Sequence, residues 1–169
     1  MTITFNNVGV VGVGAMGQGI AQMAAQAGAQ VHLFDTQAPA VEKAIRAITQ
    51  QWQKMLEKGR ISSDTCATYT GRLHACGSLA DLAVCDLVVE AIVENMAIKK
   101  ELFAQLETLV PVATVLATNT SSLSVTAIAA QLKHPVRFAG YHFFNPVPLM
   151  PLGSNSLCCS HTMLNDCFF

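Results

Sequence analysis

VGVVGVGAMGQG, residues 8–19, decides the fold of this chain. Residues 8–11 form an apolar run that predicts a buried strand, and residues 12–17 follow as a G-x-G-x-x-G motif. An apolar helical segment, residues 20–27, comes next and ends at Gly28. Strand, glycine turn and helix in this order are the start of a βαβ unit that binds a dinucleotide.

A second strand and an acid complete this unit. Residues 31–34 (VHLF) lead into Asp35, 18 residues after Gly17, which is about the spacing of an acid that binds the adenosine ribose. A glycine-rich corner without a ligand is the alternative, but all the parts occur here in the right order. Asp35 favours NAD over NADP because its carboxylate would repel a 2′-phosphate, and the next basic residue is only Lys43.

The three glycines of the motif have separate predicted roles. Gly12 permits the tight turn, and Gly14 lets backbone N–H groups approach a pyrophosphate. Gly17 lets the helix pack closely on the strand. The phosphate charge would then lie at the positive N-terminus of the helix.

Length and composition limit the class of protein. The 169 residues fit one domain, and a formal net charge of −1 gives no basic surface for nucleic acid. Hydrophobic residues make up 51% and charged residues 12%, which predicts buried parallel strands or an exposed apolar surface that needs a partner. No membrane span or signal peptide is visible, so we expect a cytoplasmic protein. Cys66, Cys76 and Cys85 are expected to be reduced thiols.

Hydrophobic periodicity predicts more alternating elements. Strands are expected at residues 72–76, 86–92, 112–117 and 136–143, and helices at residues 39–58, 62–71, 78–84, 96–110 and 124–131. Six strands that alternate with helices predict an α/β, Rossmann-type fold with a doubly wound, mainly parallel sheet. The outer side of helix 39–58 is basic, which indicates either a solvated face or a cradle for a phosphorylated substrate tail such as coenzyme A.

Acidic residues surround the end of the strand expected at residues 86–92. Glu90 interrupts its apolar run, and a buried carboxylate must be paired or hydrogen-bonded. Asn95 is expected to cap the helix that follows. That helix is expected to bury Ile98, Leu102, Leu106 and Leu109 and to expose Lys99, Lys100 and Glu101.

Polar residues follow the ends of several predicted strands. They are Gly14, Asp35, Glu94, residues 119–122 (NTSS), His142 and Asn145. Because ligands bind at the carboxyl edge of a doubly wound sheet, we expect these residues to share one site.

Four segments together resemble a known family. They are GVGAMGQGIA, DLVVEAIVEN with KKELFAQLE, TNTSSLSVTAIA and RFAGYHFFNPVPLM. Residues 5–150 closely resemble the NAD-binding domain of L-3-hydroxyacyl-CoA dehydrogenases, the 3-hydroxybutyryl-CoA and phenylacetate-pathway branches included. The resemblance implies NAD as cofactor, acyl-CoA as substrate, and oxidation of L-3-hydroxyacyl-CoA to 3-ketoacyl-CoA in fatty-acid or aromatic-acid breakdown.

The same resemblance implies a role for each matching residue. His142 is the catalytic base, Ser121 hydrogen-bonds the substrate oxygen, and Asn145 lies beside the nicotinamide and the reacting carbon. Lys58 is a candidate contact to coenzyme A. The cofactor-binding positions are Gly12, Gly14, Ala15, Met16, Gly17, Asp35, Glu94 and Lys99.

The chain departs from the family pattern after Met150. The family carries a glutamate twelve residues beyond the histidine, which orients it, and this chain has Ser154 there. Only Asp166 offers a substitute carboxylate. The family's all-helical C-terminal domain is expected to be absent, so we divide the chain into a domain at 1–150 and an atypical, foreign or frame-shifted tail at 151–169. The tail's Cys158, Cys159, His161 and Cys167 do not match zinc spacings, so no metal is expected.

Three other functions stay open. The chain could bind NAD(H) without significant turnover, or have a structural, crystallin-like role. It could also act on free 3-hydroxyacids, although HFFNP, residues 142–146, argues against that. Helices meant to dock on another domain would leave apolar surface exposed, so we expect a homo-oligomer.

Overall fold

The computed structural model describes residues 5–143 and, as backbone, the strand Ser154–Leu157. Seven strands form one sheet in the order β3-β2-β1-β4-β5-β6-β7. The first six are parallel and β7 pairs antiparallel with β6. The predicted α/β, doubly wound, mainly parallel sheet is therefore confirmed.

The elements follow the predicted order closely. The strands are β1 (Asn7–Val11), β2 (Gln30–Phe34), β3 (Leu73–Ala75), β4 (Leu87–Glu90), β5 (Val115–Thr118), β6 (Phe138–His142) and β7 (Ser154–Leu157). The α-helices are α1 (Ala15–Ala27), α2 (Ala38–Glu57), α3 (Ser63–Gly71), α4 (Met96–Leu109) and α5 (Val125–Ala129), and the 3-10 helices are η1 (Leu79–Val84) and η2 (Pro135–Arg137).

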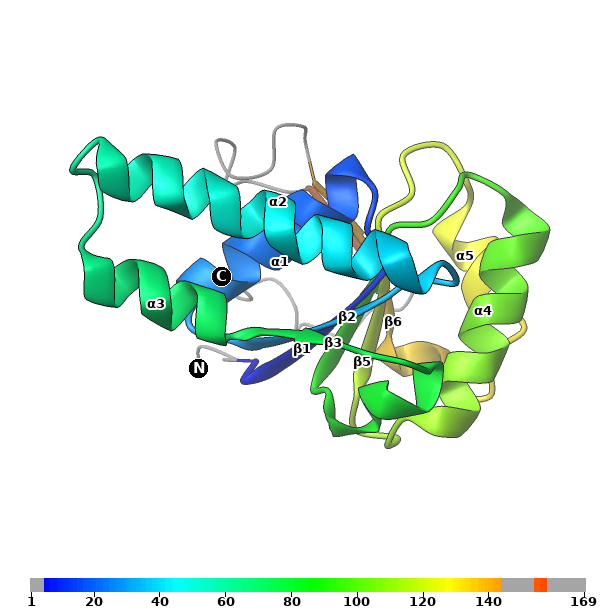
Figure 1. Ribbon diagram of the computed structural model, residues 1–169. Coiled ribbons are helices and arrows are strands. Elements are labelled where there is room, and N and C mark those ends of the chain that lie inside the picture. The colour runs from blue at the N-terminus through cyan, green and yellow to red at the C-terminus, as the bar shows by residue number, and fades with distance from the viewer. Residues whose placement is uncertain (1–4, 144–153, 158–169) are drawn as a thin grey trace.

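Helices cover both faces of the sheet (Figure 1). One core lies beneath α1, α2 and α3, with Ile20, Leu33 and Trp52 fully buried in it. The other lies beneath α4 and α5, around Phe103 and Leu116. The connections change sides between β1 and its two neighbours, β2 and β4. Such a switch point opens a crevice at the carboxyl ends of the strands.

The glycine turn brings α1 very close to β1. Gly12 has φ 91°, and a Cβ on it would lie 2.7 Å from the Ala91 carbonyl oxygen. A Cβ on Gly17 would lie 1.8 Å from the Gly12 carbonyl oxygen. The helix begins at Ala15, inside the motif and five residues before the expected start at residue 20. Because glycine has a low helix propensity, the sequence did not predict this first turn as helical.

The expectation for the buried side of α4 was partly wrong. Its buried residues are Lys99, Phe103 and Leu106, whereas Ile98 is 46% and Leu109 is 38% exposed. The stripe is rotated because Lys99, expected outside, is drawn inward by an acidic partner. The predicted cap is confirmed, since the Asn95 side chain accepts a hydrogen bond from the Ile98 N–H (3.1 Å).

Two strands begin later than predicted. The Thr114 N–H donates to the Pro111 carbonyl in a turn, so β5 starts at Val115. The segment Pro135–Arg137 forms a 3-10 turn, so β6 starts at Phe138. Strand β7 lies within the segment expected to be an atypical tail and was not predicted, because its sequence, SNSL, is short and mostly polar. Within the described part of the chain, no helix is both long and apolar enough to cross a membrane.

The close packing at Gly17 generates a stability prediction. Gly17→Ala forces a Cβ against the Gly12 carbonyl oxygen, so the free energy of unfolding should fall by about 3 kcal/mol or more. Gly71→Ala is the matched control, because a Cβ there meets nothing within 4 Å. It should change stability by less than about 1 kcal/mol. Urea unfolding of both variants checks this, and equal stabilities would contradict the close-packing account.

Candidate functional site

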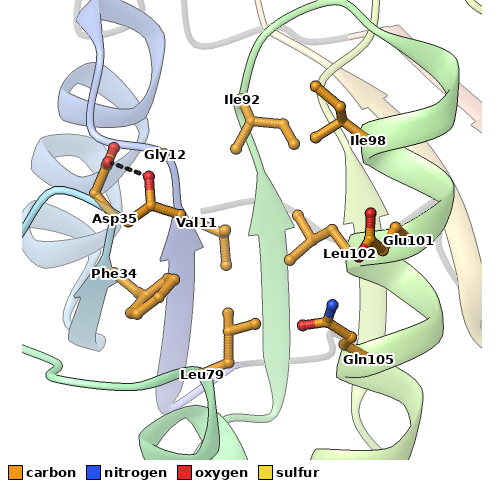
Figure 2. Close-up of a pocket in the computed structure, with 11 residues that line it drawn as sticks. Val11, Gly12, Phe34, Asp35, Leu79, Ile92, Ile98, Glu101, Leu102 and Gln105 are labelled. Carbon is orange, nitrogen blue, oxygen red and sulfur yellow. Dashed lines mark hydrogen bonds between the residues drawn. The ribbon is translucent and has the colours of Figure 1, made fainter.

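Two cavities lie at the carboxyl edge of the sheet, one on each side of the glycine turn. The first, which we call the Asp35 cavity, has a volume of about 340 Å³ and lies between the end of β2 and α4 (Figure 2). The second, the His142 cavity, has a volume of about 460 Å³ and lies near the ends of β4, β5 and β6. Ile92 lines both cavities, so together they form one extended site across the switch point.

Asp35 connects the glycine turn to the end of β2. Its Oδ2 accepts a hydrogen bond from the Val13 N–H (3.1 Å), and its Oδ1 accepts one from the Gln37 N–H (3.0 Å). Opposite the carboxylate, Figure 2 shows Ile98 and Leu102 of α4 pointing into the cavity. An apolar wall facing a carboxylate suits an adenosine, with the base against the wall and the ribose hydroxyls at the acid.

The start of α1 has the features of an anion site. Its N-cap is Gly14, which supplies no side-chain hydrogen bond to the first turn. A Cβ on Gly14 would meet nothing within 4 Å. The first N–H groups of a helix need partners, and the helix dipole favours a negative charge there. A pyrophosphate between the two cavities fits this uncapped end.

The His142 cavity collects residues from four elements. It is lined by Met16, Ala91, Ile92, Glu94, Asn119, Ser121, His142 and Phe143. His142 is the last residue of β6. The Asn119 side-chain oxygen accepts a hydrogen bond from the Phe143 N–H (2.9 Å), which ties the turn after β5 to the end of β6. Ser121 and His142 are thereby held beside the same space.

Glu94 organises the NTSS turn that contains Ser121. One oxygen, Oε1, accepts hydrogen bonds from the Ser121 N–H (3.1 Å), the Ser122 N–H (3.3 Å) and the Thr120 hydroxyl. Partial burial alone would raise the pKa of Glu94. The hydrogen bonds from Thr120 and Ser122 and the charge of Lys99 outweigh it and lower this pKa to about 2.

Behind Glu94 lies a buried ion pair. Glu90 is fully buried and accepts hydrogen bonds from Lys99 Nζ (2.5 Å), the Thr118 hydroxyl (2.7 Å) and the Ile92 N–H (2.7 Å). The expectation that a buried Glu90 would be paired is confirmed. Its partner was missed, because Lys99 was expected on the exposed side of α4. The sequence did contain a signal for this pair. Strand β4 ends with an acid, Glu90, and a basic residue, Lys99, lies one turn into the helix that follows.

The structure brings most of the predicted site residues together. Gly12 and Asp35 line one cavity, whereas Met16, Glu94, Ser121 and His142 line the other. Lys99 is 1% exposed and reaches the site only through Glu94, at 3.3 Å. Its direct contact with a cofactor stays a prediction.

Lys58 does not line either cavity. Lys58 is the C-cap of the 20-residue helix α2, so it lies about 30 Å along that helix from the end nearest Asp35. Its contact with coenzyme A stays a prediction. Asn145 lies outside the described residues, as do Asp166 and the metal candidates Cys158, Cys159, His161 and Cys167. Among the residues that the structure does describe, no cluster of three metal-binding side chains occurs.

The register of β7 shows where Ser154, the residue that replaces the family's glutamate, lies relative to His142. Ser154 pairs with His142 across the β6–β7 ladder. The position twelve residues beyond His142 is therefore its direct neighbour on the next strand, and it carries no carboxylate.

The pKa of Glu94 generates a prediction about acid stability. A carboxylate with a lowered folded-state pKa stabilises the fold above its ordinary pKa of 4.5, and this contribution is lost as the pH falls toward 2. The stability difference between wild type and Glu94→Gln should therefore be largest near neutral pH and shrink below pH 4.5. Urea unfolding across this range checks it, with the exposed Glu57→Gln as control. A difference that is constant with pH would contradict the assignment.

Comparisons with known proteins agree with this geometry. Residues 7–153 match the family model described as "3-hydroxyacyl-CoA dehydrogenase, NAD binding domain". The chain is 46% identical over 152 residues to the 3-hydroxyadipyl-CoA dehydrogenase of Escherichia coli K12, covering 90% of this chain and 32% of that protein.

Solved structures give the same result. A 3-hydroxybutyryl-CoA dehydrogenase from Escherichia coli K12 is 44% identical with a TM-score of 0.88, over 90% of this chain and 32% of that one. The (S)-3-hydroxybutyryl-CoA dehydrogenase from Ralstonia eutropha is 36% identical with a TM-score of 0.86, over 90% of this chain and 54% of that one. The chain thus spans between a third and about half of the length of such relatives. It belongs to the 3-hydroxyacyl-CoA dehydrogenase family, and the part that it matches is the family's NAD-binding domain.

Proposed function

We propose that this chain binds NAD(H), with the adenosine in the Asp35 cavity and the nicotinamide in the His142 cavity. The observation that carries the proposal is the uncapped N-terminus of α1 between two cavities, one ending at Asp35 and the other at Ser121 and His142. The Asp35 carboxylate would accept hydrogen bonds from the ribose hydroxyls and repel a 2′-phosphate. The cofactor would therefore be NAD rather than NADP.

We further propose the reaction as the oxidation of L-3-hydroxyacyl-CoA to 3-ketoacyl-CoA. The names of the relatives support this class of substrate. His142 would take the proton of the substrate hydroxyl, and Ser121 would orient its oxygen by a hydrogen bond. NAD, when bound, supplies the hydride acceptor. Asn145 and Lys58 are proposed contacts to the reacting carbon and to coenzyme A, on the resemblance alone.

A second candidate is an NAD(H)-binding module with little or no turnover. The backbone pairing of Ser154 with His142 favours it, because the resemblance implies a glutamate at position 154 and this chain has a serine there. The two candidates share the cofactor site and differ only in proton transfer. A crystallin-like structural role rests on no particular contact in the fold.

Self-association is a separate proposal. Several large apolar side chains are exposed in the described residues, namely Val84, Val93, Val112 and Val136, with exposures of 58% to 76%. Covering them with a second copy would remove apolar surface from water. Light scattering that shows only monomer would count against it.

Titration with NADH tests the cofactor proposal. The chain should bind NADH more tightly than NADPH, and Asp35→Asn should weaken NADH binding by about tenfold or more and narrow this preference. Asparagine keeps one oxygen for the Val13 N–H, so the glycine turn should survive. Asp64→Asn, an exposed acid in the first turn of α3, is the control. Equal affinity for NADH and NADPH in the wild type would contradict the role of Asp35.

Reduction of acetoacetyl-CoA separates the two candidates. If the missing carboxylate limits proton transfer, Ser154→Glu should raise the rate by about tenfold or more, without changing NADH affinity. Asn155→Glu is the matched control, because Asn155 pairs with Tyr141 rather than with His142. A wild-type rate that Ser154→Glu leaves unchanged would show that another group already serves His142.

A further inference from the structure

Three charged side chains run in a line from the core to the His142 cavity. Glu90 lies deepest, Lys99 follows at 2.5 Å, and Glu94 follows Lys99 at 3.3 Å. The first two are buried, whereas Glu94 is 36% exposed and lines the cavity. Two carboxylates and one ammonium give this line a formal charge of −1. Its only exposed member is the acid that faces the cavity.

Glu90 is held in the position that engages Lys99. The Thr118 hydroxyl on β5 and the Ile92 N–H each donate to its carboxylate at 2.7 Å. One donor belongs to the backbone and the other to a neighbouring strand, so both are fixed in place. The Glu90 carboxylate therefore cannot turn away from the Lys99 ammonium without losing two buried hydrogen bonds. Lys99 therefore contacts Glu90 more closely than it contacts Glu94.

Lys99 is therefore shared between two carboxylates, and it compensates the charge of Glu94 at the cavity wall only in part. Hydrogen bonds from Thr120 and Ser122 and the nearby Lys99 lower the pKa of Glu94 to about 2, so it is ionised at neutral pH. Without the Glu90 charge, Glu94 would be the remaining acidic partner of the Lys99 ammonium, and the two charges would cancel. The buried acid thus decides whether the line has a charge of −1 or 0.

We propose that Glu90 is a positioning residue that sets the charge of the His142 cavity and makes it favour the oxidised over the reduced nicotinamide. This inference rests on the proposed NAD(H) function. The nicotinamide ring is positively charged when oxidised and neutral when reduced, whereas the rest of the cofactor is the same in both forms. A negative charge at the cavity wall therefore stabilises one form selectively. Glu90 acts through Lys99 and Glu94 and touches no ligand itself.

The ratio of the two dissociation constants is the sharpest readout. A variant that merely loosens the site weakens both forms alike and leaves the ratio unchanged. Glu90→Gln removes one charge while keeping an oxygen for Thr118, so the preference for NAD⁺ over NADH should fall on the order of fivefold. Glu94→Gln also brings the line to zero and should shift the ratio in the same direction. Glu57→Gln, far along α2, is the control.

A double variant guards against a folding defect. Lys99 without Glu90 is a buried cation without its closest partner, which is costly. Glu90→Gln combined with Lys99→Met removes both charges, keeps the line at −1 and should restore the wild-type ratio. NADH binding is followed by its fluorescence, and NAD⁺ binding by competition with NADH, at neutral pH and low salt.

Each outcome has one meaning. A ratio lowered in both Glu90→Gln and Glu94→Gln and restored in the double variant supports the proposal. A ratio that stays at the wild-type value in either single variant, or that differs from it in the double variant, overturns the proposal while NAD(H) binding stands. A wild-type chain that binds neither form overturns the proposed function as well.

Discussion

The close approach of Gly17 to the Gly12 carbonyl is the constraint on which the rest of the site depends. The distance leaves no room for a Cβ, so α1 can begin directly above the end of β1. Its N-terminus then lies at the switch point between β2 and β4, with a cavity on each side. Were the helix displaced by one side chain, the uncapped N–H groups at Gly14 would no longer lie between Asp35 and the NTSS turn.

The acidic cluster provides the second constraint, on the other side of the switch point. Glu90 bridges β4, β5 and α4 through Thr118 and Lys99, and Glu94 extends the bridge to the turn with Ser121. Replacing a buried ion pair by apolar residues is often neutral or stabilising. A gain in the stability of the fold therefore does not by itself explain why Glu90, Lys99 and Glu94 occur together. The cluster places a charge and a set of hydroxyl groups at one wall of a cavity, which an apolar core could not do.

Local patterns predicted the fold, the glycine turn and the place of Asp35 at the end of β2 well, because their signals are local. The glycine motif, Asp35 and the Asn95 cap each depend on neighbours within one βαβ unit. The errors arose where contacts across the sheet decide the outcome. Helical periodicity placed Ile98 in the core, yet it lines the Asp35 cavity, and Lys99 was placed outside although Glu90 draws it in. Periodicity identifies an apolar face but does not distinguish a core from a cavity wall.

The proposed cofactor binding and the proposed proton transfer depend on different parts of this chain. Among the described residues, those that line the two cavities come from β1, α1, η1, α4 and the ends of β2, β4, β5 and β6. The proposed proton transfer involves in addition β7, a strand whose backbone pairs Ser154 with His142. The resemblance implies a glutamate at this position, and the chain has a serine there. A hydroxyl in place of a carboxylate at this position would therefore act on the proposed proton transfer, whereas the proposed cofactor site is formed by other residues.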